Sequence, residues 1–308
     1  MFEIDKYLEL LKSEKMKRAL KVQNGIIQIC RDFLQKKGFV EILPVIISPI
    51  TDPLTDFRVR GEIECYGFKY QITKSMIFHK QISLLTLPCI FSFSPNVRIE
   101  SSSCQHSSKH LIEFVQLDIE VKEATREDLM SLCEQMLIHL FQEIKSKFSQ
   151  ELEFFQRELN IPSAPFAKFS YQEALANYGS DYENKLSSDH QEPIWIIDFS
   201  IKDREFYDRE NLERPGILVD MDLIYPEGYG EALSGGEREF ELEKIKRRIE
   251  LKGIDLKVYE IYLKFAARGL FPSAGFGIGI ERLTRFICGL DRIDETRLFA
   301  KLPGILGL

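Results

Sequence analysis

The chain has 308 residues, of which 44% are hydrophobic and 11% aromatic, and 41 Lys and Arg against 48 Asp and Glu give a net charge of −7. This composition can bury a hydrophobic core, which excludes wholesale disorder, and the negative charge argues against a protein that binds mainly by neutralising many phosphates. The six cysteines form no Cys-x-x-Cys pair, the first twenty residues are charged throughout, and no apolar segment is long enough to span a bilayer. We therefore expect a cytoplasmic protein without a membrane partner.

Residues 5–37 repeat apolar positions at helical spacing and stop at Gly38, which predicts one long helix or two short ones. Runs rich in β-branched and aromatic residues follow, and they predict strands at 39–47, 65–73, 89–100 and 110–121. The Ser-rich polar segment 100–110 lies between the last two runs. It predicts a mobile loop that joins two antiparallel strands and is a candidate lid.

Thr125 and Asp128 have the spacing of a capping box ahead of a helix that extends to about residue 148. Further strands are predicted at 194–200, 217–225 and 274–280, with helices at 240–252 and 281–290. Strands dominate the middle of the chain without a βαβα alternation, so we predict an α+β fold with a mostly antiparallel sheet flanked by helices. No repeat or linker marks a second domain, which predicts a single domain over residues 1–308.

A glycine-rich run, Gly-Phe-Gly-Ile-Gly-Ile-Glu-Arg, extends from Gly275 to Arg282. Its spacing is not that of a dinucleotide-binding turn, because the position of the third glycine is Ile280, and no Gly-Lys-Ser/Thr of a P-loop occurs. The run predicts a strand with few side chains, against which a planar base can lie, followed by an arginine that can reach an anion. A glycine-rich core strand followed by a solvated arginine explains the run alone equally well.

Two further segments resemble parts of a nucleotide site. Arg98 ends one predicted strand, and Glu113 and Phe114 begin the next; such a strand pair can present Arg to a phosphate and an aromatic ring to a base. Together with residues 38–44 and the glycine-rich run, these segments resemble motifs 1, 2 and 3 of the class II aminoacyl-tRNA synthetases. Residues 113–118 and 230–239 are similar to the aspartyl/asparaginyl branch, and the resemblance covers about residues 38–303. It implies a class II synthetase-like, mostly antiparallel sheet.

The resemblance implies an ATP site at motifs 2 and 3. Arg98 would grip the α-phosphate, and Arg98 and Arg282 would be the catalytic residues. The other implied ATP contacts are Glu100 with the adenine amine, His110 with the outer phosphates, and Phe114 stacked on adenine opposite Arg282. Glu231 and Ser234, with Asp222 as a weaker candidate, resemble ligands of Mg²⁺, which prefers such oxygen donors.

The resemblance also implies an aspartate pocket. Lys80 and Arg238 match two cations that clamp a carboxylate of aspartate, and Asp118 would orient Lys80. Asp52 falls where the family places an acid for the ammonium group, and Ser75 and Gln116 complete the implied aspartate-binding set. Each charged residue has an alternative interpretation as a surface cation or a structural ion pair.

The departures from the family pattern concern substrate handling. Only about 37 residues, a predicted helical segment, precede motif 1, which is too short for the anticodon-reading OB-fold of this branch. Met76 and Ile77 replace the Pro and Gln of the branch, and its C-terminal Phe-Pro-Arg appears here as Phe-Ala-Lys301.

These features resemble the archaeal asparagine synthetases related to asparaginyl-tRNA synthetase. The resemblance implies that aspartate, ATP and ammonia give asparagine, AMP and pyrophosphate in a homodimer that binds no tRNA. A ligase acting on a tRNA or another acceptor in trans, and a non-catalytic amino-acid-binding relative, remain alternatives.

Overall fold

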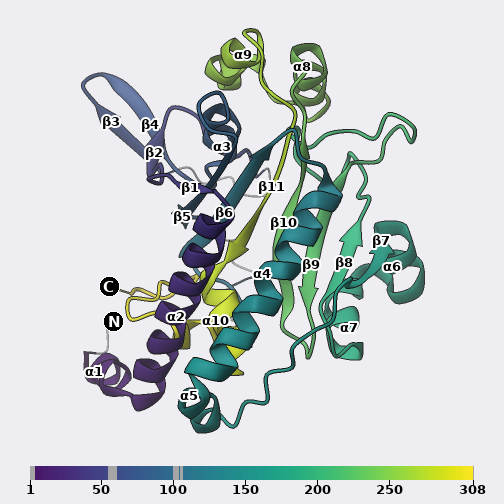
Figure 1. The fold of residues 1–308 in the computed structure, drawn as a ribbon. Helices are drawn as coiled ribbons and strands as arrows, with labels where there is room; N and C mark the ends of the chain where they lie inside the picture. Colours follow the sequence, from purple (N-terminus) through teal and green to yellow (C-terminus); the bar gives the residue numbers. More distant parts are fainter. Residues whose placement is uncertain (1–3, 55–60, 100–103, 105–106, 308) are drawn as a thin grey trace.

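The computed structural model describes residues 4–54, 61–99, 104 and 107–307 (Figure 1). Its centre is an eight-stranded sheet with the order β1-β5-β6-β11-β10-β9-β8-β7. Only the β1–β5 and β7–β8 pairs are parallel among the pairs of the described strands, so the predicted α+β fold with a mostly antiparallel sheet is confirmed. The strands are β1 (Val40–Glu41), β5 (Cys89–Val97), β6 (Glu113–Lys122), β7 (Ala167–Ser170), β8 (Ile194–Ile197), β9 (Asp220–Tyr225), β10 (Gly230–Arg238) and β11 (Ser273–Gly279).

Helices α2 and α4 cross one face of this sheet (Figure 1). The predicted N-terminal helix is two helices, because Ser13 caps the second one by accepting a hydrogen bond from the Met16 amide. The predicted capping box of Thr125 and Asp128 starts α4. The helices are α1 (Ile4–Lys12), α2 (Glu14–Lys36), α3 (Ile77–Ser83), α4 (Arg126–Lys147), α5 (Ser149–Phe154), α6 (Tyr171–Tyr178), α7 (Tyr182–Asp189), α8 (Leu242–Leu251), α9 (Glu260–Ala266) and α10 (Ile280–Cys288), with short 3₁₀ turns at Gly179–Asp181, Leu256–Tyr259 and Ile293–Thr296.

The main hydrophobic core lies between the sheet and the helices α2, α4 and α10. Side chains alternate between the two faces of a strand, so Leu117 and Ile119 of β6, and Phe276 and Ile278 of β11, all point into this core and are fully buried. The residues between them face the opposite side of the sheet. That second face is polar, and it carries the predicted site.

Two smaller cores support the edges of the polar face. One surrounds Phe78 of α3. The centroid of its ring lies 5.7 Å from that of Phe206, 5.4 Å from that of Tyr259 and 4.6 Å from that of Tyr262. The other holds α6 and α7 against β8 and β9. The sequence analysis did not predict α3, α6, α7 or α9, each of which is eight residues or shorter.

Two sequence predictions differ from the structure in detail. The run 39–47 forms only β1 and the two-residue β2 (Ile47–Ser48), because Pro44 interrupts it. Residues 65–73 form β4 (Phe68–Ile72), which pairs with β3 (Glu62–Cys65) across a turn at Tyr66 and Gly67, and these two strands and β2 make a separate small sheet. Most of the candidate lid, residues 100–103 and 105–106, lies outside the described residues. None of the helices described here is long and apolar enough to cross a membrane.

Candidate active site

One row of residues crosses the polar face of five adjacent strands. The strand registers place Asp222 opposite Ser234, Ser234 opposite Gly277, Gly277 opposite Asp118, and Asp118 opposite Ser92. Because side chains repeat with a period of two, Arg238 of β10 and Gln116 and Glu120 of β6 share this face. Residues that are far apart in the sequence therefore meet at one site through strand pairing alone.

Two adjoining cavities lie over this row. The larger has a volume of about 310 Å³, and the smaller, of about 80 Å³, lies toward α10. Arg98, Gln116, Glu231 and Gly277 line both cavities, so the two form one continuous site. A wider groove of about 900 Å³ between α1, α2 and α5 contains none of the predicted site residues, and we assign the site to the cavities with converging polar groups.

The smaller cavity collects the residues predicted for ATP. Arg98, His110, Phe114, Glu231 and Arg282 all line it, whereas Glu100 lies outside the described residues. Arg98 stacks on Phe114, with the guanidinium carbon 5.0 Å from the ring centroid, and its Nε donates to the Lys74 carbonyl at 3.2 Å. Its Nη2 donates to Gln116 at 3.5 Å, and Gln116 also lines the cavity. An arginine held at the cavity wall in this way suits an oxyanion.

Arg282 stands in the first turn of α10 and is paired with Glu231. Its Nη1 lies 3.3 Å from the Glu231 carbonyl oxygen and 3.4 Å from the carboxylate Oε2. Burial alone would raise the pKa of Glu231, but Arg282, Arg204 and Arg98 together hold it below the usual value. The Glu231 carboxylate is therefore ionised at neutral pH.

His110 is neutral at physiological pH. Burial, and then the charges of Arg282 and Lys109, lower its pKa to about 4. Its Nδ1 lies 2.6 Å from the Ser107 hydroxyl oxygen, which fixes the orientation of the ring. A neutral imidazole can donate one N–H to an anion, so the position suits a contact with outer phosphates.

The larger cavity collects the residues predicted for aspartate. Asp52, Ser75, Lys80, Gln116, Asp118 and Arg238 all line it. Lys80 Nζ donates to Asp118 Oδ1 at 2.8 Å, and both side chains are almost fully buried. Asp118 also accepts a hydrogen bond from the Ser94 hydroxyl. The Lys80 ammonium is thus held at a fixed position in the cavity wall.

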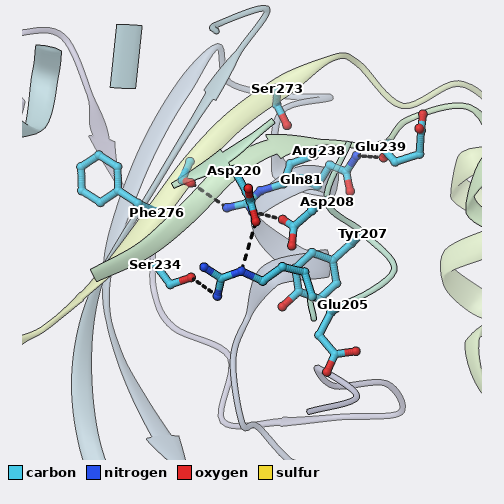
Figure 2. A network of polar contacts seen from close by, with 12 residues as sticks. Gln81, Glu205, Tyr207, Asp208, Asp220, Ser234, Arg238, Glu239, Ser273 and Phe276 are labelled. Carbon is cyan, nitrogen blue, oxygen red and sulfur yellow. Dashed lines mark hydrogen bonds and ion pairs between the residues drawn. The ribbon is translucent and has the colours of Figure 1, made fainter. Parts of the chain in front are cut away.

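Arg238 is the second buried cation of this cavity. Nη1 donates to Asp208 at 3.0 Å (Figure 2). Nε donates to Glu120 at 3.1 Å, and Nη2 to the Gly275 carbonyl at 2.8 Å. A Cβ at Gly275 would lie 2.0 Å from the Glu120 carboxylate, so glycine is needed there to admit this acid. The glycine-rich run therefore makes room for the acids beside Arg238, and its Gly277 and Gly279 line the smaller cavity.

Acids outnumber cations in the larger cavity. Its wall contains six acidic side chains and four basic ones. Asp52 accepts a hydrogen bond from the Tyr207 hydroxyl at 2.9 Å, and burial raises its pKa although Arg98 and Tyr207 lower it. Burial also raises the pKa of Asp208, against the effect of Arg238. The cavity therefore favours a ligand with both kinds of charge, whose positive group faces the acids and whose carboxylates face the cations.

The predicted magnesium ligands have the right chemistry, but they are not arranged around a metal. Carboxylate and hydroxyl oxygens suit Mg²⁺. Yet Arg204 fills the space between two of them, with Nη2 2.6 Å from Asp222 Oδ2 and Nη1 donating to Ser234 at 3.3 Å. Within the described ranges, no group of three or more His, Cys, Asp or Glu side chains is arranged to hold a metal ion. As arranged, Asp222, Ser234 and Glu231 do not fit a metal.

The sequence analysis missed Arg204, Glu120, Tyr207 and Asp208. Arg204, Tyr207 and Asp208 come from the loop between β8 and β9. The charged sequence of this loop is typical of a solvated segment. Only its aromatic residues Phe199, Phe206 and Tyr207 indicate that the loop is packed. Figure 2 shows Asp208, Tyr207 and Asp220 facing the same network as Arg238 and Ser234.

Comparison with known proteins identifies the relatives of this site. Residues 4–303 match the family described as tRNA synthetases class II (D, K and N). The asparagine–tRNA ligase of Symbiobacterium thermophilum is 29% identical over 95% of this chain and 71% of its own length. Asparaginyl-tRNA synthetase from Pyrococcus horikoshii, solved with asparaginyl-adenylate, superposes with a TM-score of 0.89 at 27% identity, covering 96% of this chain and 71% of that one. The corresponding Entamoeba histolytica enzyme, 21% identical with a TM-score of 0.85 and coverage of 96% and 69%, shares the fold.

Proposed function

Because this chain belongs to the class II tRNA synthetases (D, K and N), whose members activate an amino acid with ATP, we propose that it activates aspartate and transfers the activated carboxyl to ammonia. The products are asparagine, AMP and pyrophosphate. Family membership supports ATP-dependent activation and ligase chemistry. The identity of the amino acid and of the acceptor is our proposal.

The observation that carries the proposal is the pair of buried cations in the larger cavity. Lys80 and Arg238 both line it, and each is 3% exposed. An aspartate side chain or main chain offers a carboxylate to this pair, whereas a neutral amide offers only a weak acceptor to two charges that have already lost their water. When this pair holds the α-carboxylate, which aspartate and asparagine share, only aspartate has a second carboxylate left to be activated.

The excess of acids in the same cavity favours ammonia as the acceptor. Aspartate brings an ammonium group, and ammonia reaches the site from a pool that is mostly ammonium, so both substrates carry the charge that the acidic wall attracts. Asp52 and Asp208, with the more exposed Asp203, lie on this wall.

The chemical steps need positioning and charge stabilisation, without a protein nucleophile. A carboxylate oxygen of aspartate attacks the α-phosphorus, and pyrophosphate leaves with the electrons of the broken P–O bond. Ammonia nitrogen then attacks the acyl carbon, AMP leaves, and one proton is lost from nitrogen. Arg98, held by Phe114 and the Lys74 carbonyl, and Arg282, held by Glu231, are placed to stabilise the charge that develops on phosphate. Mg²⁺ arrives with ATP as part of the substrate.

Aspartate has to turn round relative to its position in a tRNA synthetase. Making asparagine requires the β-carboxylate to face ATP, and Lys80 and Arg238 then hold the α-carboxylate. The two carboxylates of aspartate are a few bonds apart, so the same clamp can serve either one. The ammonium group of aspartate changes position when the substrate turns round. The contact between this ammonium group and Asp52 is therefore the part of the proposal that depends most on the orientation of aspartate.

The test is a reaction without RNA. Purified protein, ATP, aspartate and ammonium chloride should give asparagine and AMP in equal amounts, and replacing aspartate with asparagine should give no AMP. Arg282→Ala serves as the inactive control. A chain that exchanges pyrophosphate into ATP with asparagine and not with aspartate would overturn the proposal.

The relatives support one other candidate, a ligase for tRNA, because the curated and solved relatives carry that name. Adding tRNA to the same reaction separates the two candidates. Asparagine formation unaffected by tRNA supports free ammonia as the acceptor. Aspartate-dependent AMP formation that requires tRNA supports the ligase.

A further inference from the structure

Arg204 is held more tightly than a surface arginine. Its Nε donates to Asp220 Oδ2 at 3.1 Å, its Nη2 forms a 2.6 Å ion pair with Asp222, and its Nη1 donates to Ser234. The guanidinium carbon lies 3.7 Å from the centroid of the Phe199 ring, which covers one face of the group. Its side chain is 19% exposed, and those of Asp220 and Asp222 are 1% and 10% exposed.

The two acids need a cation whether or not substrate is present. Asp220 and Asp222 occupy alternate positions of β9 and so point to the same face of the sheet. Two nearly buried carboxylates on one face repel each other and lose hydration, so an uncompensated pair is unstable. The Arg204 guanidinium bridges both acids and the hydroxyl of Ser234, which stands opposite Asp222 on β10.

We propose that the Arg204 guanidinium takes the place of a resident divalent cation at this end of the site, so that the chain compensates Asp220 and Asp222 with its own charge. The proposal rests on ATP-dependent activation at this site and not on the identity of the acceptor. Its geometric basis is that the oxygens of Asp222 and Ser234, two of the three expected ligands, face Arg204. Any metal that ATP carries is then held by the nucleotide and is not retained by the nucleotide-free protein.

Manganese binding to the nucleotide-free protein tests this directly. Mn²⁺ is titrated into full-length protein, and free Mn²⁺ is followed by electron paramagnetic resonance. Wild type and Arg204→Lys should show no pocket site tighter than about 1 mM. Arg204→Met should bind Mn²⁺ at least about tenfold more tightly, because Asp220 and Asp222 then face each other without a cation, and Asp222 Oδ1 has no hydrogen-bond partner in the described part of the chain.

Arg209→Met is the matched control. Arg209 lies on the same loop, pairs with Glu237 at 3.0 Å and stacks on Phe240 at 5.4 Å, but it does not line either cavity. Its removal should leave Mn²⁺ binding unchanged, and an increase equal to that of Arg204→Met would overturn the proposal by showing a general effect of lost charge.

Wild-type protein decides the question even if Arg204→Met does not fold. One Mn²⁺ bound per chain at micromolar concentration and weakened by Asp222→Asn would overturn the proposal. The absence of such a site from both the wild-type protein and the Arg204→Lys variant supports the proposal. The titration contains no aspartate, ammonia or turnover, so a failure of asparagine synthesis leaves its outcome interpretable.

Discussion

Replacing Arg238 with methionine should reduce both stability and aspartate activation, for different physical reasons. The guanidinium is 3% exposed, and its removal leaves the fully buried Glu120 and the 6% exposed Asp208 without their main cation. Breaking a buried ion pair from one side costs about 3–5 kcal/mol. We expect the lower end, about 3 kcal/mol in a urea titration, because Glu120 keeps the Ser273 hydroxyl at 2.9 Å and Lys80 at 3.8 Å.

The same substitution removes one of the two proposed aspartate clamps. A hydrogen bond between charged groups that is lost in a desolvated site is worth about 3 kcal/mol, which corresponds to about 10²-fold in kcat/KM for aspartate. Aspartate-dependent exchange of pyrophosphate into ATP measures this loss. The KM for ATP should change little, since Arg238 lines the larger cavity alone.

A second substitution separates the two effects. Adding Glu120→Gln to Arg238→Met removes the unpaired buried charge and should recover more than half of the lost stability, while aspartate activation stays low. Arg126→Met is the control: Arg126 pairs with the 7% exposed Asp198 at 2.6 Å outside both cavities, so it should cost stability without changing KM for aspartate. Recovery of full activity by the double variant would refute the role of Arg238 as a substrate clamp.

Three other predictions concern the nucleotide side and the orientation of aspartate. Arg98→Ala and Arg282→Ala should each reduce kcat/KM for ATP-dependent turnover by about 10²-fold or more, the scale for a preorganised charge stabiliser, and near-normal turnover of Arg98→Ala would exclude the assignment. Hydroxylamine in place of ammonia should trap β-aspartyl hydroxamate; a product that is mainly the α-isomer would mean that aspartate lies as in a tRNA synthetase. His110 has a folded pKa of about 4, below its value of 6.5 in the unfolded chain, so the unfolded state binds more protons between these pH values and stability falls as pH falls. His110→Gln should therefore lose less stability than wild type between pH 7 and pH 5 in urea titrations, and equal losses would contradict the shift.

The sequence predicted the class of fold and four of the five strands that cross the site, β5, β6, β9 and β11, because these depend on local patterns, whereas the glycine-rich β10 was not predicted. The residues of β6 alternate between apolar and polar, and this period of two predicts a strand with one buried and one polar face. The capping box of Thr125 and Asp128 is likewise contained in four consecutive residues. The short helices α3, α7 and α9 lack such a signal, since one or two turns display too few positions to establish a period, and the capping box of Ser170 and Glu173 that starts α6 was not recognised in the sequence.

Local patterns also located Arg98, Phe114 and Arg282, because each stands beside a recognisable run. Local patterns could not reveal what balances the charges of the site, since ion pairing joins residues that are distant in sequence; the resemblance implied the pair of Lys80 and Asp118, but not that of Arg204 and Asp222. Lys80 meets Asp118 because α3 packs on β6, and Arg204 meets Asp222 because the loop between β8 and β9 folds back over β9. The sequence by itself determined the residue types and most of the strands that carry them, with β10 as the exception. The tertiary structure decided that a guanidinium, rather than open space for a metal ion, faces Asp222 and Ser234, because the loop between β8 and β9 packs Arg204 against Phe199.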